Sequence, residues 1–351
     1  MSPGTTLSHA SPVFIRCSLN SFPHRWPDKR EDGATEDAIN EWARKMADDP
    51  GEAERRQLED QWRNVLFRPT IQVIGTDGVT VRGLKIQGMP FPRYAGKPSN
   101  DSVVLLRRAS GRLVDCAVVG RLGRGVVVEN VSEVMLENSV IAAFWGTGVV
   151  VEGAQADRRP STLRMRGCVV RNCYHRGIAI GMGCNTTLIE GNWISGSAWH
   201  GIRYDHASPR IERNIIFGNA RSGIYASGKT SAIIRQNIFL RNEKNGLSCR
   251  YDNGDTIETN LFHENVREAI AVLGASKPLI ARNWFSSRRA SIICGRAAGE
   301  SPIGDAVGNP KVIGNVFVST DPIQSGGKFI PVPLGNESGV GVRHTSLKLK
   351  G

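Results

Sequence analysis

The chain has 351 residues, of which 40% are hydrophobic and 22% are charged, as is typical of a soluble globular protein. Lysine and arginine outnumber aspartate and glutamate by 45 to 33, and the formal charge of +12 favours polyanionic partners. No run approaches the roughly 18 apolar residues of a transmembrane helix, and no P-loop, zinc-ligand or dinucleotide-binding spacing occurs.

The N-terminal region has little apolar sequence. Residues 1–33 are polar and are predicted to be disordered, and their one apolar stretch, Val13 to Ile15, is too short for the core of a signal peptide. We therefore predict a cytoplasmic protein as the sequence is written, with secretion only if the start is incomplete. Residues 34–66 predict two helices that cap the next domain, because an apolar stripe lies between charges in the second helix. The alternative for this stripe is a partner-binding helix.

Asparagines that precede an apolar pair recur through the middle of the chain. The steps between them are 22, 23, 23 and 23 residues, and the members are Asn192, Asn214, Asn237, Asn260 and Asn283. We extend this column backwards through Gly167, Asn138 and Asp115 and forwards to Asn315. Its two longest steps leave room for outward loops at 154–161 and 296–310. Such a period is the signature of a repeat protein.

Two further columns run in phase with the first. One follows it by five residues and holds Asn172, Ser197, Asn219, Asn242 and Asn265. The other is a small residue that opens a short alternating strand, and its members are Gly125, Gly148, Gly177, Gly201, Gly223, Gly246, Ala269 and Ser291. Three columns in register over eight turns indicate one structural unit of about 23 residues.

A repeat of this length holds only short strands separated by Gly, Asn and Ser, so no helix fits between strands. Stacked copies would pair each strand with its neighbours above and below, and asparagines at one corner would form an amide ladder. The prediction is an all-β fold, a right-handed single-stranded parallel β-helix of about ten turns. It spans residues 67–318, and a loosely wrapped tail follows over 319–351.

The clearest repeat copy is Gly201-Ile202, Pro209-Arg210-Ile211, Asn214-Ile215-Ile216 and Asn219. This pattern resembles the parallel β-helix repeat family, which includes pectate-lyase-like enzymes, alginate epimerases and the sugar-hydrolase-like repeats of some F-box proteins. The resemblance covers about residues 71–318. It implies the fold and a pectin-lyase-like architecture, but it does not select an activity, because the repeat residues are structural.

Alternation places Ile202 and Tyr204 inside the solenoid and Arg203 outside. Two residues before each strand-opening glycine, a column of mostly cationic and aromatic residues reads Gly146, His175, Trp199, Arg221, Lys244, Arg267 and Arg289. Stacked cations repel one another unless an anion neutralises them. The residues predicted to bind substrate on this surface are His175, Arg176, Trp199, Arg221, Lys244, Arg250 and Tyr251. The alternative is a solvated basic face with Glu243 and Glu268 as partners.

Polar residues concentrate on neighbouring turns of the same face. Proton abstraction from an acidic sugar needs a cation for its carboxylate, a base and a proton donor. The predicted catalytic residues are His200, Arg203, Asp205, His206 and Tyr225. The run Tyr204-Asp205-His206 resembles the Tyr, Asp and His motif of alginate epimerases, although its spacing is tighter and the Asp-Pro-His of that family is absent. A glycoside hydrolase needs two carboxylates that flank the scissile bond. The candidates on this face are Asp205 and Asp252, which strand spacing places about 10 Å apart.

No cofactor is expected. Asp252 and Asp255 around Gly254 give only a weak calcium signal, for which a polar turn is the favoured alternative. The seven cysteines have no ligand spacing, and we predict that most are buried free thiols. The predicted partner is an acidic polysaccharide or another extended polyanion, with nucleic acid disfavoured and no membrane partner. The predicted function is binding, with lyase or epimerase processing, and the alternative is a non-catalytic platform for proteins or glycans.

Overall fold

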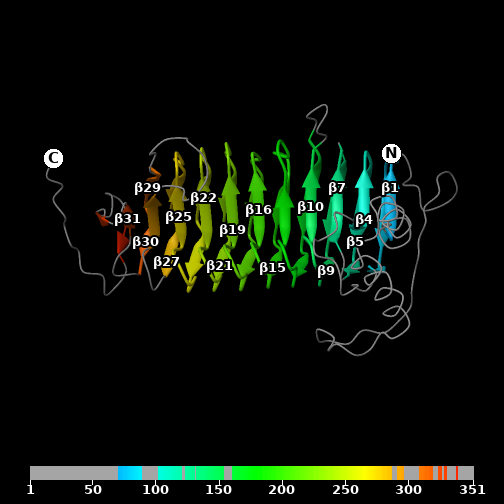
Figure 1. The fold of residues 1–351 in the computed structure, drawn as a ribbon, viewed down its shortest axis with the longest axis horizontal. Coiled ribbons are helices and arrows are strands. Elements are labelled where there is room, and N and C mark those ends of the chain that lie inside the picture. The colour runs from blue at the N-terminus through cyan, green and yellow to red at the C-terminus, as the bar shows by residue number, and fades with distance from the viewer. Residues whose placement is uncertain are drawn as a thin grey trace, which may run out of the picture.

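The computed structural model describes residues 70–88, 102–120, 123–130, 132–153, 160–286, 291–295, 308–318, 323–325, 328–329 and 337–338. In these ranges every regular element is a β-strand, and the strands stack into three long sheets (Figure 1). The predicted N-terminal segment and helical cap lie outside the described residues. Among the described residues, no helix is long and apolar enough to cross a membrane.

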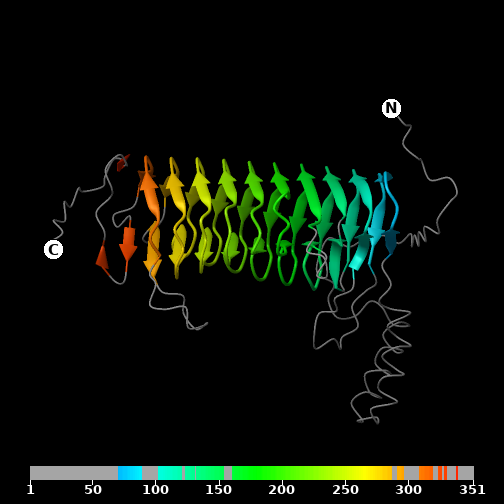
Figure 2. The ribbon, with the colours of Figure 1, turned by 90° about the horizontal axis from the view of Figure 1, so that it is seen from above.

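Each turn contributes one strand to each sheet, so every third strand pairs (Figure 2). Sheet A contains β1 (Ile71–Ile74), β4 (Ser102–Arg107), β7 (Arg124–Glu129), β10 (Val149–Glu152), β13 (Ile178–Ile180), β16 (Ile202–Asp205), β19 (Ile224–Ser227), β22 (Leu247–Arg250), β25 (Ile270–Leu273), β28 (Ile292–Gly295), β31 (Ile323–Ser325) and β32 (Lys328–Phe329). Sheet B contains β2 (Val79–Arg82), β5 (Ser110–Val114), β8 (Glu133–Glu137), β11 (Thr162–Arg166), β14 (Leu188–Glu190), β17 (Arg210–Glu212), β20 (Ile233–Arg235), β23 (Thr256–Glu258), β26 (Leu279–Ala281) and β29 (Lys311–Ile313).

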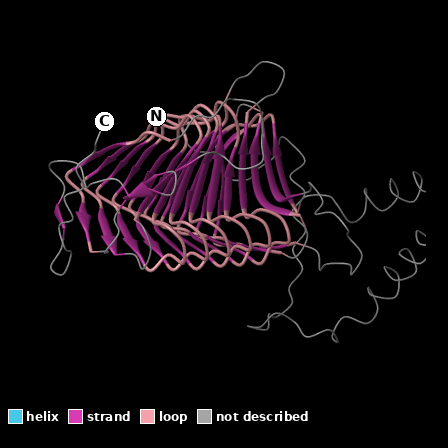
Figure 3. Cartoon of the chain, turned by 60° about the vertical axis from the view of Figure 1, so that its left-hand side comes forward, coloured by secondary structure: helices cyan, strands magenta, loops and turns pink. Residues whose placement is uncertain are grey.

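Sheet C contains β3 (Lys85–Gln87), β6 (Ala117–Val119), β9 (Val140–Ala142), β12 (Val169–Arg171), β15 (Trp193–Ser195), β18 (Ile215–Phe217), β21 (Ile238–Leu240), β24 (Leu261–His263), β27 (Trp284–Ser286), β30 (Val316–Phe317) and β33 (Glu337–Ser338). Neighbouring strands are parallel, except that β32 runs antiparallel to β31. The predicted parallel β-helix is confirmed (Figure 3). The three sheets hold 12, 10 and 11 strands, against the prediction of about ten turns, and three short strands fall within the predicted tail.

The asparagine column forms a continuous ladder between sheets B and C. The amide nitrogen of Asn214 donates to the side-chain oxygen of Asn237 over 2.9 Å, and Asn237 donates to Asn260 over 3.0 Å. Each amide oxygen also accepts from the backbone N–H of the turn before it, as Asn237 does from Asn214. A second ladder joins Asn219, Asn242 and Asn265 after sheet C. Buried corners thus have their polar groups satisfied, which explains why asparagine recurs.

The backward extension of this column is wrong by one residue. In those turns the ladder position belongs to Cys116, Ser139 and Cys168, of which Cys168 donates its N–H to Asn192 over 2.8 Å. The residues chosen from the sequence, Asp115, Asn138 and Gly167, instead have positive φ angles of 54°, 48° and 62°. Asn172 departs from the second ladder in the same way, with φ 56°. Left-handed corners also favour Gly, Asn and Asp, so they imitate a ladder residue in sequence.

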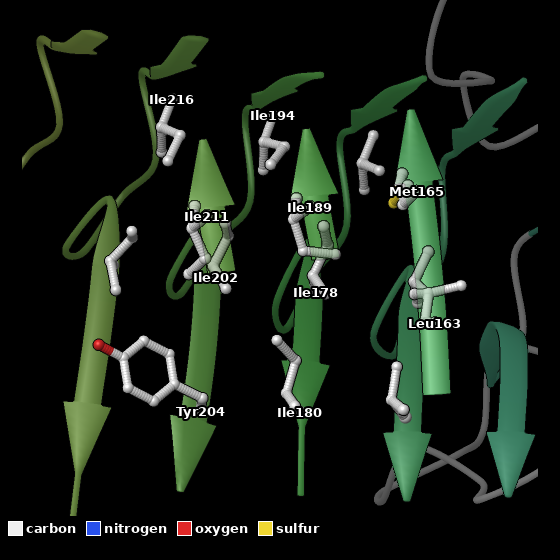
Figure 4. Close-up of a cluster of buried hydrophobic side chains, with 14 of the residues drawn as sticks. Leu163, Met165, Ile178, Ile180, Ile189, Ile194, Ile202, Tyr204, Ile211 and Ile216 are labelled. Atoms are coloured by element: carbon white, nitrogen blue, oxygen red, sulfur yellow. The ribbon is translucent and has the colours of Figure 1, made fainter. Parts of the chain in front are cut away.

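Apolar side chains fill the interior in stacks. Isoleucines from all three sheets line it, and Tyr204 is fully buried among them, as predicted (Figure 4). Phe239, Phe262, Phe285 and Phe317 stack with ring centroids 4.6, 5.2 and 5.0 Å apart. The six cysteines of the described residues are buried free thiols, in agreement with the prediction, and burial raises the pKa of Cys173 to about 12.

Replacing Asn237 with leucine is expected to lower the free energy of unfolding by about 1–3 kcal/mol, because buried backbone groups of the neighbouring turns lose their partners. The groups affected include the Asn214 N–H and the carbonyl oxygen of Ile211, 2.9 and 2.8 Å from the Asn237 side chain. Urea denaturation of both proteins measures the difference. Glu243, which is exposed one residue after a ladder position, provides the control as Glu243→Leu. Equal stabilities for the two variants would contradict a stabilising role for the ladder.

Candidate functional site

The column of cations and aromatics predicted ahead of sheet A is a continuous backbone ladder. From one turn to the next, the N–H of each member donates to the carbonyl of the member before it, over 2.8–3.2 Å, along the series Gly146, His175, Trp199, Arg221, Lys244 and Arg267. We call His175, Trp199, Arg221, Lys244 and Arg267 the basic ridge. Because strands in this stack repeat at about 4.8 Å, the ridge presents side chains at a regular short interval along the solenoid. Arg289 lies outside the described residues.

Aromatic rings form the N-terminal part of this surface. Trp145 and Tyr174 stack with their centroids 4.0 Å apart and an interplanar angle of 3°. His175 lies against Trp199 at 5.0 Å, and the guanidinium groups of Arg176 and Arg221 lie 5.2 and 4.4 Å from the centre of the Trp199 ring. Cation–π contact holds these guanidinium groups in place without neutralising their charge.

Tyr225 is the centre of the second group of side chains. Its ring lies 4.6 Å from that of His200. The guanidinium groups of Arg203 and Arg250 lie 5.6 and 5.2 Å from its centroid. Pairing of β16 with β19 puts Arg203 directly beside Tyr225, and pairing of β19 with β22 puts Arg250 on the following turn. The predicted catalytic residues His200 and Arg203 therefore lie around Tyr225, which was also predicted to be catalytic. Arg250, which was predicted to bind substrate, lies against the same ring.

Asp205 links this centre to His206. One carboxylate oxygen of Asp205 lies 3.4 Å from Arg203 Nη2, and the other lies 2.9 Å from His206 Nδ1. His206 has a positive φ of 48° and stacks over Gly228, where an added Cβ would lie 2.4–2.7 Å from the imidazole. Glycine at 228 therefore leaves the space that the His206 ring occupies. This carboxylate–imidazole pair orients His206 as a general base is oriented in hydrolases.

Electrostatic repulsion is built into the surface. Within the described part of the chain, no carboxylate lies within ion-pair distance of the cations Arg176, Arg221, Lys244, Arg250 and Arg267. Burial and the neighbouring Arg203 and Arg221 lower the pKa of Arg176 to about 10, and burial with neighbouring arginines lowers the pKa of Lys244. Glu268, proposed as a partner in the alternative interpretation, accepts instead from Asn245 over 2.8 Å.

On sheet B of the same solenoid, by contrast, arginines are neutralised by carboxylates. There Glu212 is paired with both Arg210 and Arg235, at 2.8 and 3.1 Å, and Glu190 is paired with Arg213. Burial of Glu212 opposes ionisation, but its bonds to Arg235 and Arg210 outweigh this, so its pKa is lowered. Among the described residues the basic ridge lacks such carboxylates, and two buried donors near it, Nε of Arg176 and Nε of Arg250, have no hydrogen-bond partner there.

His200 is a neutral hydrogen-bond donor in this setting. Burial, followed by repulsion from Arg176, Arg221, Arg203 and Lys244, lowers its pKa to about 3. Its Nδ1 lies 3.3 Å from the backbone N–H of Ser222, which can only donate. The ring proton therefore sits on Nε2. Ser222 could not be identified from the sequence, because it acts through its backbone N–H, which every residue type except proline has.

The remaining predicted residues have separate positions. Tyr251 follows β22 at a left-handed corner with φ 69°, in the same column as His206 and Gly228. Asp252 is exposed, whereas Asp255 is fully buried and hydrogen-bonded to Tyr204 inside the solenoid. These two carboxylates do not converge, so the calcium hypothesis for them is wrong.

A family model described as periplasmic copper-binding protein (NosD) matches residues 82–298, more than half of the chain. The chain belongs to the NosD family. Because this family is described as periplasmic, the predicted cytoplasmic location is wrong; it rested on one short apolar stretch at residues 13–15. No curated protein matches this NosD-family chain in sequence.

Copper binding, which the NosD description names, needs several donor side chains close together. No group of three His, Cys, Asp or Glu side chains in the described residues could hold a metal ion. The bond from His206 Nδ1 to Asp205 leaves Nε2 of His206 able to bind a metal, but a single imidazole is not a metal site. Burial raises the pKa of Cys168 and Cys294 to about 11, so both stay protonated, whereas copper prefers thiolate or free imidazole. The described part of this NosD-family chain does not fit copper.

Solved structures with the same architecture share little sequence with it. The periplasmic alginate epimerase AlgG is 14% identical, with a TM-score of 0.53 over 76% of this chain and 75% of that one. The catalytic unit of a thermostable GH87 α-1,3-glucanase from Streptomyces thermodiastaticus strain HF3-3 is 13% identical, with a TM-score of 0.53 over 79% and 68%. At these identities the NosD-family chain shares the fold of both, and the likeness extends no further.

Proposed function

We propose that the chain binds an acidic polysaccharide along the basic ridge and acts on its uronate residues at the Tyr225 centre, as a lyase or epimerase. The observation that carries this proposal is the set of cations without carboxylate partners beside flat aromatic rings. A polyanion would neutralise Arg221, Lys244 and Arg267 on successive turns, and sugar rings would stack on Trp199. The two solved neighbours support the sugar class only by analogy of fold, since one is named for alginate and the other for α-1,3-glucan.

The order of side chains around Tyr225 supports proton abstraction. Arg203 neutralises the carboxylate of a bound uronate, and His206, oriented by Asp205, takes the C5 proton on Nε2. The electron pair left at C5 is held by the neutralised carboxylate. In a lyase it forms the C4–C5 double bond as the C4–O bond breaks, and the leaving oxygen takes a proton from the hydroxyl group of Tyr225. In an epimerase C5 instead receives the hydroxyl proton of Tyr225 on its opposite face.

Binding is tested by titrating alginate, pectate and a glycosaminoglycan into the protein in a calorimeter. Arg221→Ala and Lys244→Ala are each expected to weaken binding about tenfold, because each removes one charge-assisted contact worth about 1.5 kcal/mol. Arg164, an exposed arginine on sheet B, is the matched control and is expected to leave affinity unchanged as Arg164→Ala. Equal affinities for all three variants would remove the basic ridge as the binding surface.

Catalysis is tested separately on the polymer that binds. A lyase produces an unsaturated uronate that absorbs in the ultraviolet, and an epimerase incorporates deuterium at C5 in D2O, which proton NMR detects. His206→Gln should reduce either signal at least tenfold and leave affinity within a factor of about two. If the protein binds polymer but gives neither signal, the chain is a non-catalytic glycan platform. That outcome favours a non-catalytic function, in which the basic ridge with its unneutralised cations remains the binding surface.

A further inference from the structure

Sheet C presents an uninterrupted apolar stripe to solvent, away from the basic ridge. One outward-facing column pairs directly from strand to strand, through Val169, Trp193, Ile215, Ile238, Leu261, Trp284 and Val316. Trp193 and Trp284 have 45% and 50% of their surface exposed, which is unusual for tryptophan in a monomeric protein. Trp193 is held upright by an edge contact with Phe217, with ring centroids 5.0 Å apart.

The residue types in this stripe are arranged symmetrically about Ile238. The two tryptophans lie two strands on either side of it, and Ile215 and Leu261 lie one strand on either side. Val169 and Val316 lie three strands away in opposite directions. A twofold axis along β21 would place each residue of one copy opposite a residue of similar size in the other. This is the self-complementarity that an isologous interface requires.

We infer that sheet C joins two copies of this chain face to face, with their solenoids antiparallel and the twofold axis along β21. Trp193 of each copy then packs against Trp284 of the other, and Ile238 meets its own counterpart. The second outward column obeys the same rotation. Leu240 meets itself, Phe217 lies opposite His263, and the serines at 195 and 286 face each other.

Charge at the edge of this face fits a second copy better than a polyanion. Arg241 and Glu264 form an ion pair at 2.7 Å at the corner after sheet C. Rotation brings the two pairs together as a neutral quartet, so no charge is left without a partner. Among the described residues of these seven strands, Arg171 on β12 is one exposed cation at the end of the face, whereas an apolar partner surface buries both tryptophans.

The dimensions of the face predict a weak, concentration-dependent dimer. Seven strands at about 4.8 Å give a length of about 29 Å, and three residues per strand give a width of about 10 Å. The flat area is therefore about 300 Å² per copy, below the roughly 800 Å² of a standard stable interface. We expect dissociation in the micromolar range. The sheet A face remains open in both copies, so this inference stands whether or not polysaccharide binds there.

Light scattering after size-exclusion chromatography, over a concentration series, is the first test. The parent is expected to approach twice the protomer mass as concentration rises, and Ile238→Glu should raise the dissociation constant at least tenfold because like charges would meet on the axis. Ile233 lies on the same turn but points outward from sheet B, and it is 37% exposed. Ile233→Glu is therefore the control and should dimerise as the parent does. Thermal melts establish that both variants remain folded.

Cross-linking tests the symmetry itself, in a Cys17→Ser background, since the six described cysteines are buried. Sheets in face-to-face contact lie about 10 Å apart, so Ile238→Cys should cross-link to its own copy with a short bis-maleimide. Trp193→Cys alone should not, because its two copies would lie about 22 Å apart across four strand spacings and the sheet gap. A mixture of Trp193→Cys and Trp284→Cys proteins should cross-link. A monomer at every concentration, a dimer that survives Ile238→Glu, or efficient cross-linking of Trp193→Cys alone would each overturn the inference.

Discussion

Replacing Asp255 with alanine is expected to lower the free energy of unfolding by about 3–6 kcal/mol, because several buried donors lose their acceptor together. Asp255 is fully buried in the solenoid. It accepts from the hydroxyl of Tyr204, from Nδ2 of Asn253 at 2.7 Å and from the backbone N–H of Ala232 at 2.6 Å. None of these donors has room to reach water without opening the turn that holds it.

Chemical denaturation at neutral pH measures this effect. Asp252, three residues earlier and exposed, is the matched control, and Asp252→Ala should change the stability by no more than about 0.5 kcal/mol. Tyr204→Phe combined with Asp255→Ala should cost less than the two single changes added, since the removed groups serve each other. Strict additivity, or an Asp255→Ala protein as stable as the Asp252→Ala protein, would show that the buried network contributes little.

The fold was predictable because each repeat contains a position that only a few residue types can occupy. A ladder asparagine must both donate and accept at a buried corner, and few residues replace it, so Asn214, Asn237 and Asn260 mark the turns clearly. The prediction failed by one residue at Asn138 because a left-handed corner selects the same residue type for a different reason. Ser139 is the true ladder member, and its hydroxyl donates to the carbonyl of Glu137. Because serine has no side-chain amide, a column defined by asparagine does not include it.

The site was predictable only in its grouping. Vertical stacking of columns brought Arg203, Tyr225 and Arg250 together as the sequence indicated. The chemistry of the site also depends on backbone contacts that a column of residue types does not reveal. One example is the N–H of Ser222, which fixes the tautomer of His200. The burial of Asp255 also escaped prediction, because it precedes β23 in a corner where strand alternation does not apply, beside Ala232 of the turn before it.

Acidification is expected to destabilise the protein through His200. Its pKa in the folded state is about 3, against 6.5 for the free side chain. A lowered pKa means that the contribution to stability is complete above about pH 6.5 and is lost as the pH falls towards 3. Between pH 7 and pH 4 we expect the free energy of unfolding to fall by about 2–3 kcal/mol on account of this residue.

The measurement compares urea denaturation of the parent and of His200→Gln at pH 7 and pH 4. The variant keeps a neutral side chain and should lose about 2–3 kcal/mol less than the parent over this range. His263, which lies outside the site with a half-exposed side chain, is the control, and His263→Gln should follow the parent. Because part of the His200 shift comes from repulsion by Arg176, Arg221, Arg203 and Lys244, a bound polyanion should reduce the pH dependence of the parent but not that of His200→Gln. A parent and a variant with the same pH dependence would mean that His200 is not held neutral by its surroundings.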